Sequence, residues 1–163
     1  MDEPPSKTDR VKAWFKAHVD SEAGQAFVTD DMNFVMPPSA AFSMTGDLPW
    51  KGRESLRRLG ILDRALYKTY GVESKMKLHF IIEEGDWVLM QFESTFDTWE
   101  NELYHNYYVF GVRFEDDKIA EAFDLNDTAH LEALILGTPE KSAGFKARIA
   151  AMRSEMNAPK DVW

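Results

Sequence analysis

The first half of the chain carries apolar residues three or four positions apart, which is the spacing of amphipathic helices. Ser6 or Thr8 can cap a first helix, whose apolar stripe consists of Val11, Trp14, Phe15 and Val19. A second stripe predicts a helix over about residues 54–70, with Gly71 at the position of a C-cap. Residues 32–36 form an apolar run that two prolines stop, which predicts a short strand. Residues 39–49 have no periodicity and are expected to form a loop.

The second half changes to a period of two, which is typical of strands. This alternation predicts four strands, over residues 75–82, 87–96, 103–114 and 118–125. Asp127 and Thr128 then cap a short helix that ends near Leu136, and a last helix is expected over residues 142–155. Helices followed by a meander of strands predict an α+β fold, with helices packed on one face of a curved antiparallel sheet.

Length and composition fit one domain with a core of its own, because the chain has 163 residues and is 44% hydrophobic. We expect that domain over residues 1–137 and a C-terminal helical extension over residues 138–163. The extension can dock on its own domain or on a partner subunit, and the sequence leaves both open. The start of the chain is acidic and has no apolar signal-peptide core, so the expected location is cytoplasmic.

The charge balance of the chain excludes some classes of binding partner. The net charge is −9, and the segment from Glu83 to Glu132 holds 14 acidic residues against two basic ones. Such a surface repels polyanions and anionic lipids, so neither nucleic acid nor a membrane is an expected partner. The absence of cysteine excludes disulfides, thiolate metal sites and cysteine nucleophiles.

One segment carries a recognisable pattern. From Tyr104 to Thr128 the chain reads Y-H-N-Y-Y-V-F-G-V-R-F-E-D-D-K-I-A-E-A-F-D-L-N-D-T: an aromatic strand with an Asn, a D-D-K-I turn, an acid near the strand end and an N-D-T step into a helix. This segment resembles the closing hairpin of the nuclear-transport-factor-2-like superfamily, in its SnoaL-like branch. The earlier runs D-D-M-N-F and W-K-G-R-E-S-L fit the same order of elements, so the resemblance covers roughly residues 8–136.

The resemblance implies a cone-shaped fold in which a curved antiparallel sheet wraps around the N-terminal helices and leaves a deep pocket. Members include ketosteroid isomerase, limonene epoxide hydrolase, polyketide cyclases and the phenazine-biosynthesis A/B proteins, while others bind ligands without chemistry. Many members dimerise through the open face of the sheet. A homodimer is therefore expected here, and the aromatic-rich strands also offer more apolar surface than one layer of helices covers.

Asp124 is the first candidate for catalysis. It shares a strand face with the small residues Ala120 and Ala122, and its chain neighbours Phe123 and Leu125 are apolar. A carboxylate in such surroundings loses water, which raises its pKa toward the range of a general acid or base. By resemblance, the matching position holds the working carboxylate in the epoxide hydrolases and the phenazine proteins. The alternative is a structural Asp that helps to cap the following helix.

Tyr104, Asn106 and Tyr108 alternate on one face of the aromatic strand with Phe110. Phenol and amide groups are suitable donors to an enolate oxygen; ketosteroid isomerase, whose oxyanion hole pairs a Tyr with a protonated Asp, is the known example. The same residues are equally consistent with packing on the helices or with a dimer interface.

Glu93 lies one hairpin earlier, where it could face Asp124 as a second carboxylate. Epoxide hydrolases of the superfamily use such a pair around an Arg, which this strand lacks, and an exposed strand face explains Glu93 equally well. His79 and His105 are further candidate bases, each with a structural alternative. No metal is expected, because no ligands stand at short spacing, and the predicted chemistry needs no cofactor.

The loop before the second helix carries Phe42, Met44, Leu48 and Trp50, and it can either cover the pocket mouth as an apolar lid or fold onto the core through its own Trp. With Phe92 and Phe110, these four residues are the expected substrate-binding residues. Together these residues predict a cofactor-free isomerase, cyclase or lyase that acts by general acid–base catalysis on a small hydrophobic carbonyl compound. A non-catalytic binding or dimerisation module is one alternative, and an epoxide hydrolase or dehydratase, which needs Asp124 and Glu93 around one water, is the other.

Overall fold

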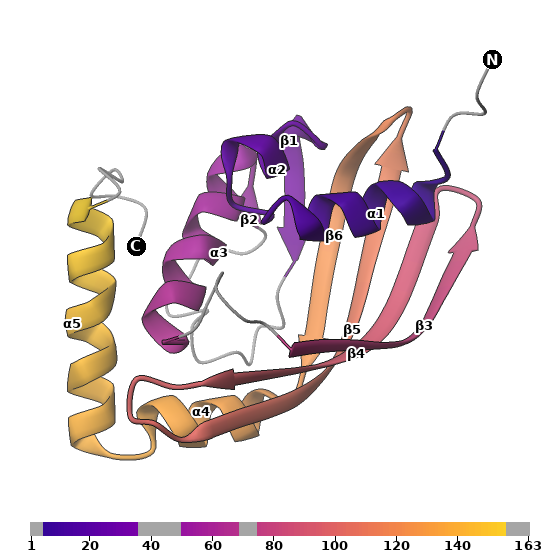
Figure 1. The fold of residues 1–163 in the computed structure, drawn as a ribbon. Helices are drawn as coiled ribbons and strands as arrows, with labels where there is room; N and C mark the ends of the chain where they lie inside the picture. Colours follow the sequence, from indigo (N-terminus) through magenta and orange to yellow (C-terminus); the bar gives the residue numbers. More distant parts are fainter. Residues whose placement is uncertain (1–4, 36–49, 69–74, 156–163) are drawn as a thin grey trace.

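The computed structural model describes residues 5–35, 50–68 and 75–155, and it shows one curved sheet whose inner face is covered by helices (Figure 1). The strands are β1 (Val28–Val35), β2 (Trp50–Lys51), β3 (Lys75–Glu84), β4 (Trp87–Asp97), β5 (Leu103–Glu115) and β6 (Lys118–Asn126). Their order in the sheet is β2-β1-β6-β5-β4-β3. The α+β cone and the four-strand meander are confirmed, and each meander strand runs one or two residues past its predicted end.

The sheet is mixed rather than purely antiparallel. Strand β1 pairs in parallel with β6, and all the other pairs are antiparallel. Strand β1 is also longer than the run that the apolar pattern predicted, because Val28 at its start pairs with Ile119. The two-residue strand β2 was not predicted.

The helices are α1 (Lys7–Lys16), α2 (Glu22–Gln25), α3 (Arg53–Leu66), α4 (Thr128–Leu136) and α5 (Pro139–Glu155). Ser6 and Asp127 cap α1 and α4 as expected, each by accepting a backbone N–H three residues ahead. Helix α3 ends at Leu66, earlier than predicted, because Tyr67 is extended and bridges to Thr98. No helix in these described ranges is long and apolar enough to cross a membrane.

The alternation along the strands divides the sheet into two faces. Along β4, Val88, Met90, Phe92, Ser94 and Phe96 are buried, whereas the residues between them are partly exposed. Along β5 the buried set begins with Tyr104, Asn106, Tyr108 and Phe110. These side chains point toward α1 and α3 and form the inner face; the intervening side chains form the outer face.

Aromatic side chains join α1 to the inner face. The Phe15 ring lies 5.2 Å from that of Phe110 and 6.0 Å from that of Phe92, edge to face in both cases. The Trp14 ring lies 6.1 Å from that of Phe110, and Trp14 has no exposed surface. Edge-to-face pairs of this kind contribute roughly 0.5–1.5 kcal/mol each beyond their burial, so they hold α1 firmly over the sheet.

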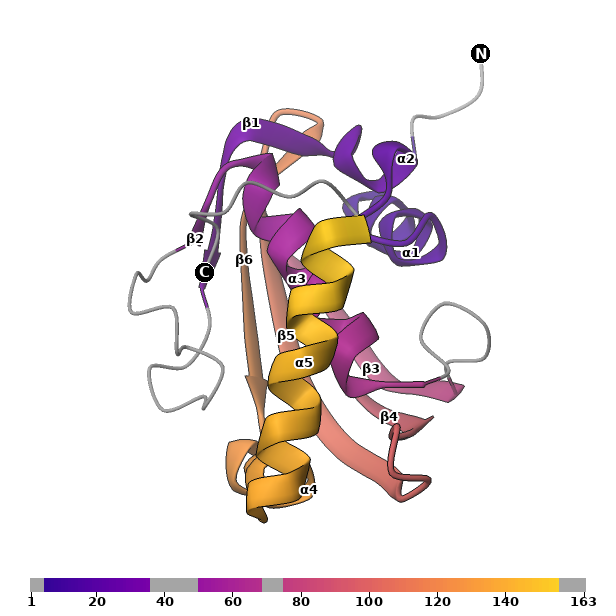
Figure 2. The ribbon, with the colours of Figure 1, turned by 90° about the vertical axis from the view of Figure 1, so that its left-hand side faces the viewer.

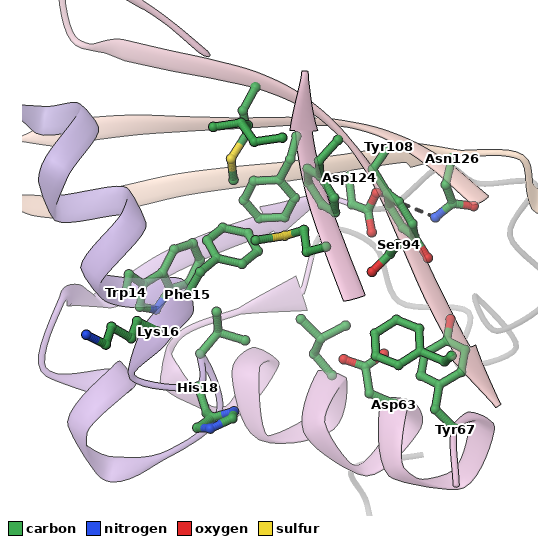
Figure 3. Close-up of a pocket in the computed structure, with 18 of the residues that line it drawn as sticks. Trp14, Phe15, Lys16, His18, Asp63, Tyr67, Ser94, Tyr108, Asp124 and Asn126 are labelled. Atoms are coloured by element: carbon green, nitrogen blue, oxygen red, sulfur yellow. Dashed lines mark hydrogen bonds between the residues drawn. The ribbon is translucent and has the colours of Figure 1, made fainter. Parts of the chain in front are cut away.

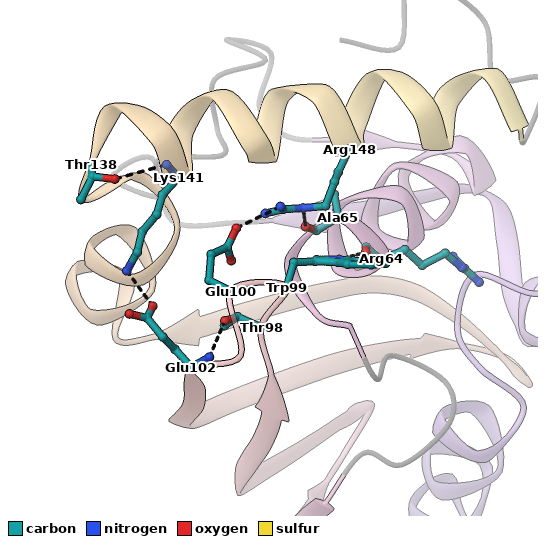
Figure 4. A network of polar contacts seen from close by, with 9 residues as sticks. All are labelled: Arg64, Ala65, Thr98, Trp99, Glu100, Glu102, Thr138, Lys141 and Arg148. Carbon is teal, nitrogen blue, oxygen red and sulfur yellow. Dashed lines mark hydrogen bonds and ion pairs between the residues drawn. The ribbon is translucent and has the colours of Figure 1, made fainter.

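Helix α5 packs along α3 (Figure 2), so within one chain the C-terminal extension docks on its own domain. Its Phe145 is 1% exposed. Arg148 donates to the carbonyl oxygen of Ala65 over 2.8 Å and to Glu100 over 3.0 Å (Figure 4). The Trp99 indole N–H donates to the carbonyl oxygen of Arg64 over 3.0 Å. Two carbonyls at the C-terminal end of α3, which have no partner within the helix, are thereby satisfied.

Candidate active site

A cavity of about 520 Å³ lies between the inner face of the sheet and helices α1 and α3 (Figure 3). Its walls are mostly apolar, with Phe15, Leu59, Met90, Phe92 and Phe110 among the lining residues. This size and lining suit a small organic ligand. A few polar groups are set into the apolar wall, and they decide what chemistry the cavity can support.

Asp124 projects into this cavity from β6. Burial raises the pKa of its carboxyl group from 3.8 to about 7, because the charged form has lost water; a hydrogen bond from Asn126, 3.5 Å long, acts weakly in the opposite direction. Asp124 does not cap α4, since the capping side chain is Asp127. The structure therefore favours the candidate acid or base over the structural alternative.

Asp63 is a second carboxyl group on the cavity, and it was not among the predicted residues. It projects from α3 on the wall opposite Asp124 (Figure 3). Burial raises its pKa well above the usual value, the charges of Asp20 and Asp124 raise it further, and Arg64 lowers it. A signal was present in the sequence: an acid stands within the apolar stripe of the helix, four residues after Leu59.

Three tyrosine hydroxyls form a connected group beside the two carboxyls. The hydroxyls of Tyr104 and Tyr108 are 2.5 Å apart, and that of Tyr67 hydrogen-bonds with both. Burial raises the pKa of Tyr104 to about 12 and those of Tyr67 and Tyr108 well above the usual value. All three stay protonated near neutral pH and can act as hydrogen-bond donors. Tyr67 was also not predicted as a site residue, because the predicted helix included it.

Tyr108 lines the cavity, whereas Tyr104 and Asn106 lie behind it. The Asn106 amide nitrogen donates to the Tyr104 hydroxyl over 2.8 Å and to the carbonyl oxygen of Asp127 over 3.0 Å, and its oxygen accepts from two backbone N–H groups. Three hydrogen bonds join the three tyrosine hydroxyls, so each hydroxyl donates once within the group, and Tyr108 can donate to a ligand only in place of one of these bonds. Tyr104 and Asn106 support Tyr108 from behind and do not line the cavity.

Glu93 does not face Asp124. It lies on the outer face, where it accepts from Lys77 over 2.9 Å and from His105 over 2.7 Å, while His79 lies 3.5 Å away. Its hydrogen bonds with Lys77 and His105 lower the pKa of Glu93 to about 2. Placing Glu93 and His79 at the pocket was wrong, because a period of two separates the faces without saying which one is inner.

The predicted apolar contacts are placed in part. Phe92 and Phe110 line the cavity, and the Phe92 ring stacks on Tyr108 at 5.0 Å. Phe42, Met44 and Leu48 lie outside the described residues, as does the side chain of Trp50.

Two residues of the cavity lining each hold a buried polar atom with no hydrogen-bond partner among the described residues. They are Trp14, through its indole nitrogen, a donor, and Asn126, through its side-chain oxygen, an acceptor. Such atoms are costly to leave unpaired, and neither has surface open to the cavity. Across the same described ranges, no group of three or more His, Asp and Glu side chains is arranged to hold a metal ion.

Comparison with known families identifies the fold. The family model of the SnoaL-like domain matches residues 10–122. The chain belongs to the SnoaL-like domain family. Helices α4 and α5 of this SnoaL-like protein follow the matched region. Among the curated proteins, no match is found.

Solved structures agree with this assignment. An NTF2-like protein of unknown function from Burkholderia pseudomallei superposes with a TM-score of 0.66 at 15% identity, over 78% of this chain and 95% of its own. A protein from Jannaschia, provisionally named a SnoaL-like polyketide cyclase, superposes with a TM-score of 0.62 at 13% identity, over 85% of this chain and 99% of its own. A protein with a ketosteroid isomerase-like fold from Catenulispora acidiphila, in complex with trimethylamine, superposes with a TM-score of 0.54 at 13% identity, over 74% of this chain and 86% of its own. At these identities the comparisons establish the fold of the SnoaL-like domain, and the chemistry has to be argued from the cavity.

Proposed function

We propose that this SnoaL-like protein is a cofactor-free enzyme of the isomerase or cyclase type, which moves a proton next to the carbonyl group of a small apolar substrate. The observation that carries the proposal is the Asp124 carboxyl group, which lies beside Tyr108 on the sheet wall of an apolar cavity and opposite Asp63 on α3. The provisional name of the Jannaschia neighbour, a polyketide cyclase, is consistent with this class of reaction.

In the proposed step, the ionised Asp124 takes a proton from the carbon next to the carbonyl. The electrons of the broken C–H bond form the enolate double bond, and the carbonyl π electrons move onto oxygen. Tyr108 donates a hydrogen bond to that oxygen, and the neutral carboxyl group of Asp63 can donate a second one. In an isomerisation, Asp124 then returns the proton to another carbon of a conjugated enolate. In a cyclisation, the enolate carbon attacks a second carbonyl group, and Asp124 returns the proton to the alkoxide oxygen formed there.

The shifted pKa values suit these roles. With a pKa of about 7, Asp124 is divided between its ionised and neutral forms near neutral pH, so it can both accept and return a proton. Asp63 has its pKa raised by burial and also by the charge of Asp124. When two carboxyl groups repel each other in one cavity, their pKa values move apart, so that one can act as an ionised base while the other remains a neutral acid.

The test uses proton exchange, because it needs no knowledge of the product. The protein is incubated in D₂O with a panel of small cyclic ketones, and deuterium uptake next to the carbonyl is followed by NMR. We expect uptake above the buffer rate with the wild type, rising with pH to a plateau above about pH 7, where Asp124 is ionised. Asp124→Asn is expected to lose the effect.

Glu93→Gln is the matched control, because it removes a carboxylate from the opposite face of the same sheet. It should keep the exchange activity of the wild type. If some ketone exchanges equally fast with the wild type and with Asp124→Asn, Asp124 is not the base and the proposed mechanism fails.

A second candidate function is the non-catalytic binding of an organic cation. Aromatic rings of Trp14, Phe15, Tyr67 and Tyr108 line the cavity together with two acids, and rings and carboxylates both attract ammonium groups. The trimethylamine in the Catenulispora structure belongs to that protein, but it is a ligand of this chemistry. Release of protons when trimethylammonium binds near pH 7, with no exchange activity on any ketone, would favour this alternative.

The epoxide hydrolase or dehydratase alternative needed Glu93 beside Asp124, and that arrangement is absent because the two side chains lie on opposite faces of the sheet.

We also propose that the protein is a homodimer through its outer face. Apolar side chains are exposed there on three strands: Phe80 and Ile82 on β3, Tyr107 and Val109 on β5, and Leu125 on β6. An apolar patch spread over neighbouring strands is typical of an interface. Light scattering at micromolar concentration should give twice the chain mass, and a monomer mass would contradict the proposal. The cytoplasmic location stays a prediction.

A further inference from the structure

The residues that are both exposed and part of the cavity lining mark its mouth. On one side these are Lys12 and Lys16 of α1 and His18 just after it; on the other they are Met76 and Leu78 of β3. A lysine that lines a cavity and is exposed as well lays its aliphatic part along the wall and keeps its ammonium group at the rim. The mouth of the cavity therefore has a basic side and an apolar side.

The basic residues of α1 fall into two groups. Lys7 pairs with Asp86 at 2.8 Å, and Arg10 pairs with Asp117 at 2.9 Å, both away from the cavity. Lys12 and Lys16, by contrast, have no ion pair or hydrogen bond with any residue that the structure describes. They stand four positions apart on one helix, where like charges repel each other. The chain carries 28 acidic residues, yet none of those described neutralises this pair.

The polar groups that α1 brings to the cavity are the two ammonium groups, whereas both carboxyl groups lie on other walls, on α3 and β6.

We infer that the α1 side of the cavity binds an anionic group, so that the ligand is an apolar molecule carrying a carboxylate, held by Lys12 and Lys16. Together with the function proposed above, on which this part rests, the substrate is a keto acid in the broad sense: the carbonyl group lies between Asp124 and Tyr108 and the carboxylate lies at the mouth. A carboxylate fits better than a phosphate ester, because the second negative charge would be repelled by the two acids and by the net charge of −9.

Two fluorescent probes test the anion site without any substrate. They are 8-anilinonaphthalene-1-sulfonate and N-phenyl-1-naphthylamine, which is the same molecule without the sulfonate. We expect the sulfonate to bind about tenfold more tightly at low salt, as two partly exposed ammonium contacts would give, with the preference falling as salt is added. The double variant Lys12→Met/Lys16→Met should bind both probes equally and keep the wild-type affinity for the neutral probe.

Lys118→Met/Lys146→Met is the matched control, since it changes the net charge equally at two exposed lysines that do not line the cavity. It should keep the preference for the sulfonate. Equal affinity of the wild type for both probes, or a preference that survives in the Lys12/Lys16 variant, would overturn the anion site and leave the proposed acid–base chemistry intact. Binding of neither probe would overturn both, because each depends on an accessible cavity.

Competition for the bound sulfonate then identifies the anion. We expect 2-naphthoate to displace it more strongly than 2-naphthyl phosphate, and displacement by the phosphate alone would overturn the assignment of a carboxylate.

Discussion

The buried charge of Asp124 has a consequence for stability that can be measured without a substrate. In the folded protein the pKa of this carboxyl group is about 7, against 3.8 for an exposed one. Between these two values the unfolded chain releases a proton that the folded chain retains, so folding becomes less favourable as the pH rises. Below the lower value both states are protonated, and above the higher value both are ionised.

Replacing Asp124 by Asn removes this penalty, because Asn has nearly the shape of a protonated Asp and does not ionise. A shift from 3.8 to about 7 is roughly three units, or about 4 kcal/mol at about 1.4 kcal/mol per unit. This is a ceiling, since water at the cavity mouth screens the charge, and we expect an increase of about 2–4 kcal/mol in the free energy of unfolding above pH 7. Loss of the Asp124 charge also removes its repulsion of the Asp63 carboxylate, which raises the free energy of unfolding further.

The assay is urea unfolding of the wild type and of Asp124→Asn at several pH values from about 4 to about 8. The two proteins should have similar stability at the acidic end, and the variant should gain steadily until about pH 7 and stay constant beyond it. Parallel pH dependences of the two proteins would refute the reasoning, because they would mean that Asp124 ionises equally easily in both states.

Three further outcomes are expected. Glu93→Gln should show the opposite pH dependence, since the lowered pKa of Glu93 stabilises the fold above its unfolded value of 4.5 and this contribution disappears as the pH falls toward 2; urea unfolding would show it. Tyr108→Phe should lower ketone proton exchange about 100-fold in the NMR assay through loss of the enolate donor, and an unchanged rate would exclude that role. Arg148→Met should destabilise by about 1–3 kcal/mol in thermal unfolding because it leaves the Ala65 carbonyl unpaired, whereas Lys141→Met, which removes a partly exposed ion pair and leaves no backbone group unpaired, should cost about 1 kcal/mol or less.

Much of the fold could be predicted from the sequence because its signals are local. The period of two along β4, β5 and β6 and the caps at Ser6 and Asp127 depend on neighbouring residues, and they fixed the elements to within a few positions. The parallel pairing of β1 with β6 could not be predicted in this way, because it joins segments almost 90 residues apart. The docking of α5 on α3 depends on contacts of the same long range.

The same difference between local signals and long-range contacts explains which residues of the candidate site could be predicted. Asp124 was predictable because its small and apolar neighbours lie beside it on one strand. Asp63 was missed although it stands inside an apolar helical stripe, because that signal does not show which wall the acid faces. Glu93 was assigned to the wrong face, since alternation defines two faces and only the packing of α1 and α3 shows which one is inner.

Titration of the Asp124 carboxyl group is the most direct measurement of the central claim. The carboxyl carbon is followed by ¹³C NMR from about pH 3 to about pH 9, with Asp124→Asn identifying the resonance. We expect a midpoint near 7, as for a carboxyl group enclosed in an apolar cavity and able to exchange a proton at neutral pH. A midpoint near 4 would contradict the account, because it would show that Asp124 is solvated and fully ionised at neutral pH.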